Sequence, residues 1–71
     1  MTNATKIASR LKEIRTDNHL SQKEFGALLS VSQDTVSLWE TGKSIPTVEF
    51  LIAISKRFGV SVDYILCLKD F

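Results

Sequence analysis

The chain has 71 residues, of which 44% are hydrophobic and 24% are charged. This length supports one small domain and excludes most enzymes by size, while the apolar content excludes a disordered chain. Nine Lys and Arg against eight Asp and Glu leave a net charge of +1, which by itself argues neither for nor against a nucleic-acid partner.

Neither a leader nor a membrane-spanning segment is predicted, because residues 1–6 lack an apolar core and the longest apolar runs are short. Cys67 is the only cysteine, so no disulfide forms within the chain and a reducing cytoplasm fits. Repeats, linkers and low-complexity tracts are absent from the sequence. We therefore expect a single domain over residues 1–71.

The first predicted element is an amphipathic helix. Ala4, Ile7, Leu11 and Ile14 recur at helical spacing, and charged residues occupy the other faces. Residues 17–19 favour helix ends and turns, so the helix is expected to end there.

Three later segments share one helix-start pattern, in which an apolar residue precedes a serine and a second apolar residue follows five positions after the first. The serine can accept a hydrogen bond from an orphan backbone N–H, and the two apolar residues close a hydrophobic staple. Glu24 completes a capping box with the first of these serines. The three sets are Leu20, Ser21 and Phe25; Val31, Ser32 and Val36; and Val60, Ser61 and Ile65.

These starts predict a second helix over about 22–29 and a third over about 33–41, joined by so short a turn that the helices must cross steeply. Gly42 is expected to end the third helix, and Thr47 to cap a fourth that ends at Gly59. The fifth helix is predicted over about 62–68. The inward face of the fourth helix is expected to hold Val48, Leu51, Ile54, Ser55 and Phe58. No strand pattern competes, so the predicted fold class is all-α.

Residues 22–41 have the packing pattern of a helix-turn-helix unit. Gly26 supplies a small residue where the two helices meet. Val36 and Trp39 are expected to face the core, which turns a small, polar and mostly uncharged face outward. Such a face suits the DNA major groove better than bulk solvent. It holds Gln33, Asp34, Ser37, Leu38 and Thr41.

The side chains of this face have the chemical groups needed to contact DNA bases. The Gln33 amide can pair with adenine, the Ser37 hydroxyl can donate or accept at several base edges, and Leu38 can pack on a thymine methyl. Asp34 can accept from cytosine, yet it can equally stabilise the positive end of the helix dipole.

The chain resembles the Cro/repressor-type, or XRE-like, helix-turn-helix proteins of phages and bacteria. The resemblance covers residues 7–66 and rests on five blocks in order: RLKEIR at 10–15, LSQKEFG at 20–26, VSQ at 31–33, WETGK at 39–43 with Pro46, and FGVS at 58–61. It implies a compact five-helix, lambda-repressor-like bundle and a transcriptional regulator, most often a repressor, that reads operator half-sites in double-stranded DNA.

The resemblance also implies roles for individual residues. Gln22 matches a position that binds phosphate and braces Gln33, and Arg15 and Glu40 match an ion pair between the first and third helices. The implied base-contacting residues are Gln33, Asp34, Ser37 and Leu38, and the implied backbone-contacting residues are Gln22, Ser32, Thr35, Thr41 and Lys43. Two positions depart from the family pattern: Ser30 stands where a left-handed glycine is usual, and Leu38 replaces a frequently polar side chain.

The sequence leaves two alternatives to DNA binding. An enzyme, a metal site or a cofactor is not expected, because His19 and Cys67 are single residues with no acidic pair beside them; His19 is expected in solvent and Cys67 in packing. A protein-interaction or antitoxin-like module with the same fold is the stronger rival. Apolar residues at the edges could instead serve a homodimer on a palindromic operator, in a cytoplasmic, nucleoid-associated protein. The candidate dimer contacts are Phe50, Tyr64, Leu68 and Phe71. Phe50 can equally cover the core, and Ile52 is expected to do so.

Overall fold

Five helices form in the computed structural model, which describes residues 3–71. Residues 1 and 2, which the predicted domain includes, lie outside the described part. No strand occurs between residues 3 and 71, and the all-α prediction is confirmed. The helices are α1 (Asn3–Asp17), α2 (Gln22–Leu29), α3 (Gln33–Glu40), α4 (Val48–Phe58) and α5 (Val62–Ile65).

Local capping chemistry accounts for where three of the helices begin. Ser21 and Glu24 form a reciprocal capping box, in which the Glu24 N–H donates to Ser21 Oγ at 3.0 Å and the Ser21 N–H donates to Glu24 Oε1 at 2.9 Å. Ser32 and Ser61 cap α3 and α5 through their hydroxyl oxygens, each of which accepts a backbone N–H from three residues further on. All three predicted starts are therefore confirmed.

The second apolar residue of each staple lies at the centre of the core. Phe25, Val36 and Ile65 are fully buried, together with Leu11 of α1 and Ile54 of α4. The Phe25 ring stacks on Phe58 with ring centroids 5.3 Å apart. One core thus receives side chains from every helix, and it fixes the orientation of α2 and α3.

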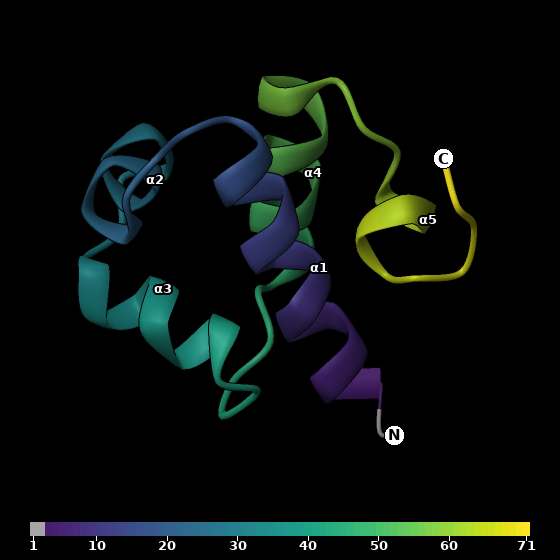
Figure 1. The fold of residues 1–71 in the computed structure, drawn as a ribbon, viewed down its shortest axis with the longest axis horizontal. Helices are drawn as coiled ribbons and strands as arrows, with labels where there is room; N and C mark the ends of the chain where they lie inside the picture. The colour runs from purple at the N-terminus through teal and green to yellow at the C-terminus, as the bar shows by residue number, and fades with distance from the viewer. Residues whose placement is uncertain (1–2) are drawn as a thin grey trace.

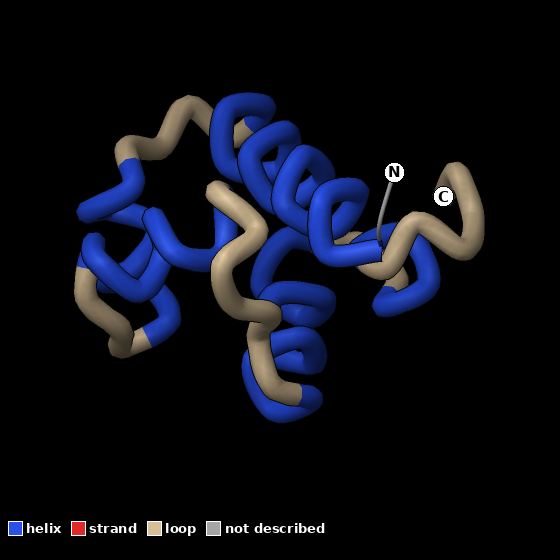
Figure 2. Tube along the Cα trace, turned by 90° about the horizontal axis from the view of Figure 1, so that it is seen from below, coloured by secondary structure: helices blue, strands red, loops and turns tan. Residues whose placement is uncertain are grey.

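The helices are arranged so that α2 and α3 lie on one side of α1 and α4, with α5 and the C-terminal residues on the other (Figure 1). The helix α2 packs on α3, α1 also packs on α3, and α5 packs on α4 and α1. Figure 2 shows the same helices joined by short loops. The unit formed by α2, α3 and their turn therefore occupies one side of the molecule.

The turn between α2 and α3 depends on two small residues. A Cβ atom at Gly26 would lie 2.7 Å from the backbone oxygen of Val31, so this position excludes any side chain. The contact is with the turn and not, as predicted, with the third helix itself. Ser30 adopts the left-handed conformation, with φ of 61° and ψ of 36°. The usual turn backbone is thus kept with serine in place of glycine, at a cost of about 1 kcal/mol.

The structure corrects three local predictions. The fifth helix ends at Ile65 and not near residue 68, because Cys67 adopts a positive φ of 61° and the N–H of Leu68 turns back to the oxygen of Asp63. Thr47 precedes α4 in an extended conformation but makes no side-chain capping bond. Val48 was expected on the inward face and is 69% exposed, because the first turn of α4 extends beyond the core.

Candidate nucleic-acid interface

The third helix separates buried from exposed residues as its sequence predicts. Val36 and Trp39 are buried, whereas Gln33 and Asp34 are exposed at its N-terminal end. Ser37 is half-buried and Leu38 is 44% exposed on the same outward face. The four candidate base-contacting residues are thus presented by one rigid helix that two buried side chains anchor.

The candidate backbone-contacting residues surround this face. Ser32 and Thr35 lie at the start of α3, where the Ser32 hydroxyl accepts from the Thr35 N–H at 3.2 Å. Thr41 follows the helix, and its hydroxyl donates to the Ser37 oxygen at 2.9 Å. Lys43 is exposed in the loop beyond it. The hydroxyls of Ser32 and Thr41 therefore stabilise the two ends of the helix as well as bordering its outward face.

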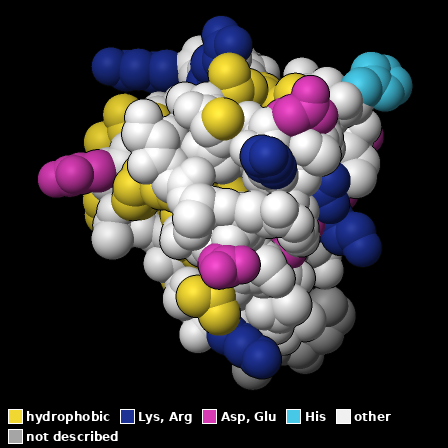
Figure 3. Space-filling view, turned by 90° about the vertical axis from the view of Figure 1, so that its left-hand side faces the viewer, with side chains coloured by type: hydrophobic (Ala, Val, Ile, Leu, Met, Phe, Trp, Pro, Cys, Tyr) yellow, Lys and Arg dark blue, Asp and Glu magenta, His cyan; other side chains and the backbone are white. Residues whose placement is uncertain are grey.

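Figure 3 shows the side of the molecule on which α2 and α3 lie. Backbone and uncharged polar side chains cover most of this side, and basic and acidic side chains are interspersed among them. No continuous basic surface covers the face shown, which agrees with the net charge of +1. Binding through this side would depend on a few placed contacts more than on a strong overall field.

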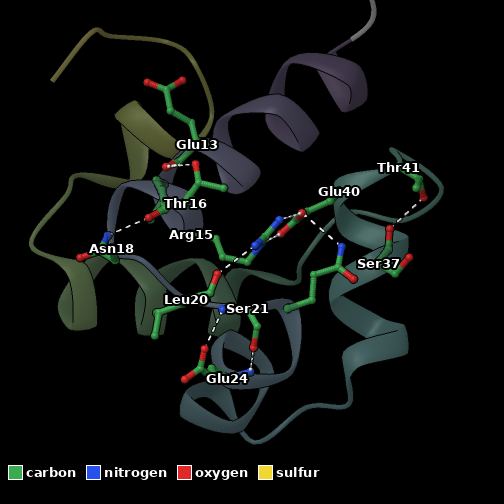
Figure 4. A network of polar contacts seen from close by, with 12 residues as sticks. Glu13, Arg15, Thr16, Asn18, Leu20, Ser21, Glu24, Ser37, Glu40 and Thr41 are labelled. Atoms are coloured by element: carbon green, nitrogen blue, oxygen red, sulfur yellow. Dashed lines mark hydrogen bonds and ion pairs between the residues drawn. The ribbon is translucent and has the colours of Figure 1, made fainter.

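Arg15 and Glu40 are joined by a two-point ion pair between α1 and the last residue of α3 (Figure 4). Arg15 Nε donates to Glu40 Oε2 at 2.7 Å, and Nη2 donates to Oε1 at 3.0 Å. The two side chains are only 13% and 4% exposed. Hydrogen bonding to the Glu40 carboxylate raises the pKa of the Arg15 guanidinium above its ordinary value. The pair therefore fixes the C-terminal end of α3 against α1.

The same guanidinium also contacts the loop that precedes α2. Arg15 Nη1 donates to the backbone oxygen of Leu20 at 2.9 Å. A single side chain thus connects the first helix, the loop before the second and the end of the third.

Gln22 makes a contact that the sequence did not reveal. Its side-chain Nε2 donates to Glu40 Oε1 at 3.3 Å, which connects the first residue of α2 to the ion pair. Its expected roles, bracing Gln33 and binding phosphate, stay predictions. The only sequence signal for the Glu40 contact was that Gln22 and Glu40 both belong to motif blocks of the same helix-turn-helix pattern.

Arg10 belongs to a different part of the molecule from α3. Its guanidinium lies 3.9 Å from the centre of the Tyr64 ring and donates to the Tyr64 backbone oxygen. Arg10 therefore stabilises the packing of α5 on α1.

The candidate dimer contacts differ in exposure. Phe50 is half-buried against Trp39, with ring centroids 5.4 Å apart, and Tyr64 is half-buried beneath Arg10. Leu68 and Phe71 are 70% and 80% exposed. Ile52 does not cover the core as expected but is 44% exposed, because it faces away from the buried side of α4.

The other residues that the sequence singles out are His19 and Cys67. His19 is exposed in the loop after α1, and the half-buried Cys67 thiol donates to the Lys6 oxygen at 3.4 Å. Cys67 lies beyond α5 and not on it, because that helix ends earlier than predicted. Among residues 3–71 no helix is long and apolar enough to cross a membrane, and no cluster of His, Cys, Asp or Glu is arranged to hold a metal ion.

Comparison with known proteins gives a consistent set of relatives. A family model described as Helix-turn-helix matches residues 11–65. The HTH-type transcriptional activator BcrR of Enterococcus faecalis is 40% identical over 80% of this chain, which spans only 28% of that protein's length. An uncharacterised HTH-type transcriptional regulator of Methanocaldococcus jannaschii is 32% identical, and the match covers 90% of this chain and 97% of that protein's length.

A solved structure extends the match to the fold. The crystal structure of the c2 repressor of Salmonella phage P22, in complex with a synthetic operator, superposes with a TM-score of 0.77 at 30% identity. The match covers 83% of this chain and 89% of the c2 chain. The expected repressor-like bundle is thereby confirmed, and the chain belongs to the XRE-type helix-turn-helix family.

Proposed function

We propose that this protein is a sequence-specific DNA-binding transcriptional regulator that reads operator half-sites with α3 in the major groove. The observation that carries the proposal is the outward face of α3, where every candidate side chain is polar and uncharged except for Asp34 and the apolar Leu38. A helix that faces only solvent usually carries Lys and Glu there. The likeness to a repressor crystallised with operator DNA supports the same function.

The proposed contacts fall into two groups. Gln33, Asp34, Ser37 and Leu38 contact base edges, and their side chains provide an amide, a carboxylate, a hydroxyl and a methyl-bearing surface. The second group positions the protein on the phosphate backbone without reading sequence. It consists of Gln22, Ser32, Thr35, Thr41 and Lys43.

We propose repression as the mode of regulation, because occupancy of an operator by a small domain blocks access to that DNA without any further contact. The net charge of +1 limits the number of phosphate contacts that one copy makes. Specific affinity then requires two copies of the protein on a palindromic operator. We propose that the protein acts in the cytoplasm, at the nucleoid. Phe50, Tyr64, Leu68 and Phe71 are the proposed dimer contacts. No catalytic role, cofactor or small-molecule substrate is part of this proposal.

The experiment that tests the proposal is selection of bound duplexes from a random DNA pool. Enrichment of one motif, present as two inverted copies about one helical turn apart, is the expected result. A single unpaired motif would contradict the dimer while preserving sequence-specific binding. Absence of any enriched motif would contradict the proposed function.

A protein-partner role is the second candidate, because Val48 and Ile52 on α4 are 69% and 44% exposed and are spaced one helical turn apart. Binding to a random duplex at low and at moderate salt separates the two functions. Affinity that is measurable at low salt and falls as salt rises supports DNA binding. No affinity at either salt concentration would favour the protein partner.

A further inference from the structure

The carboxylate of Glu40 is a shared acceptor at the centre of the helix-turn-helix unit. Arg15 donates to both of its oxygens, and Gln22 Nε2 donates to Oε1 at 3.3 Å. The Glu40 side chain is 4% exposed, so these contacts replace its hydration. Glu40 therefore receives hydrogen bonds from α1 and from the first residue of α2 at the same time.

This shared acceptor fixes the orientation of the Gln22 amide. An ionised carboxylate accepts hydrogen bonds and cannot donate them, so the amide must turn its NH₂ group, and not its oxygen, toward Glu40. One N–H of that group is used in this contact. The other N–H has no partner among the residues that the structure describes. The amide is thus held with a spare donor at the beginning of α2.

The spare donor suits an anionic oxygen. A phosphate oxygen accepts hydrogen bonds, whereas an amide turned the other way would present its own carbonyl oxygen and repel the phosphate. The unpaired backbone N–H groups of a helix N-terminus favour an anion at the same place. Arg15 neutralises the nearby Glu40 charge, which would otherwise oppose the approach of DNA.

We propose that Glu40 is a positioning residue for DNA binding, which acts by holding the Gln22 amide so that an N–H faces a backbone phosphate. This inference rests on the proposed function. It assigns to Glu40 a role in affinity that is separate from its ion pair with Arg15. It also predicts that the acceptor at position 40, and not the negative charge, carries this role.

The test measures how much the substitution Gln22→Ala weakens binding in three backgrounds. The probe is a short random-sequence DNA duplex at low salt, because a phosphate contact does not depend on sequence. The first background is the wild type. The second is Glu40→Gln, which keeps an acceptor oxygen at position 40. The third is Arg15→Met with Glu40→Leu, which replaces the whole pair by apolar side chains and leaves no buried charge alone, so that folding is preserved.

In the wild type and in Glu40→Gln, the Gln22→Ala substitution is expected to weaken binding about tenfold, the effect of losing one hydrogen bond to a charged group. In the Arg15→Met and Glu40→Leu background the same substitution is expected to change affinity by less than about twofold, because the amide is already released. Circular dichroism and a thermal melt on each background check that the comparison is made between folded proteins.

If Gln22→Ala weakens binding equally in all three backgrounds, the positioning role of Glu40 is overturned and the proposed function stays intact. If Gln22→Ala no longer weakens binding in the Glu40→Gln background, the claim that the acceptor oxygen at position 40 matters more than its negative charge is overturned. If the wild type itself does not bind the duplex, the proposed function fails and this inference fails with it.

Discussion

Gly26 in α2 lies directly against the backbone of Val31 in the turn that follows. The Val31 N–H donates to the Gly26 oxygen at 2.9 Å, and a Cβ at Gly26 would lie 2.7 Å from the Val31 oxygen. Because this obstacle is backbone, it cannot rotate away as a side chain would. The close approach sets how α3 leaves α2, and so it sets the direction of the outward face.

We therefore predict that Gly26→Ala destabilises the protein by about 1–2 kcal/mol, since the steric cost outweighs the gain of about 1 kcal/mol in helix propensity. Urea denaturation measures the change. The matched control is Gly59→Ala, where open space surrounds the added Cβ and only the positive φ of 67° opposes it. A stabilised Gly26→Ala protein would show that the turn can adjust.

At Ser30, by contrast, a substitution is expected to stabilise the protein. Its left-handed conformation, with φ of 61°, is one that glycine adopts without strain. Ser30→Gly is expected to raise the free energy of unfolding by about 0.5–1 kcal/mol. Ala27→Gly, in the helix interior, should lower it by about the same amount and serves as the control. A decrease for Ser30→Gly would mean that the serine side chain contributes more than its backbone costs.

The Arg15 and Glu40 pair is expected to matter more for stability than for the choice of base. Glu40→Ala leaves the 13% exposed guanidinium without its carboxylate, and removal of one partner of a buried pair typically costs about 3 kcal/mol. A thermal melt compares this variant with Glu49→Ala, which removes an exposed carboxylate from α4. An unchanged melting temperature for Glu40→Ala would contradict the structural role of the pair.

The capping box at α2 predicts a defined dependence on pH. Hydrogen bonds from the Ser21 N–H hold the pKa of Glu24 below its ordinary value of 4.5. Because the folded pKa is the lower one, the stabilisation is complete above the unfolded pKa and is lost as the pH falls through the folded pKa. Glu24→Gln should remove this component, so the stability difference between wild type and variant should shrink on acidification below about pH 5. A difference that stays constant would contradict the prediction.

Much of the fold could be predicted because the signals are local. Ser21, Ser32 and Ser61 each cap the helix that follows them, and this chemistry needs only residues within a few positions. The buried and exposed faces of α3 follow from helical spacing for the same reason.

The parts that could not be predicted depend on contacts between distant residues. Arg10 joins α5 only because the fold brings Tyr64 beside it, 54 positions away in the chain. The exposure of Val48 likewise depends on where the core stops. At the candidate interface, the contact between Gln22 and Glu40 spans 18 positions, and no periodic pattern joins those two residues.

The central claim is that the outward face of α3 reads base sequence, and the most direct measurement is the affinity of Gln33→Ala for a selected operator and for random duplex. The claim predicts that this variant loses about 1–3 kcal/mol of discrimination between the two DNAs. Lys43→Ala, by contrast, should weaken binding to both by a similar factor. Equal weakening of both DNAs by Gln33→Ala would contradict the claim.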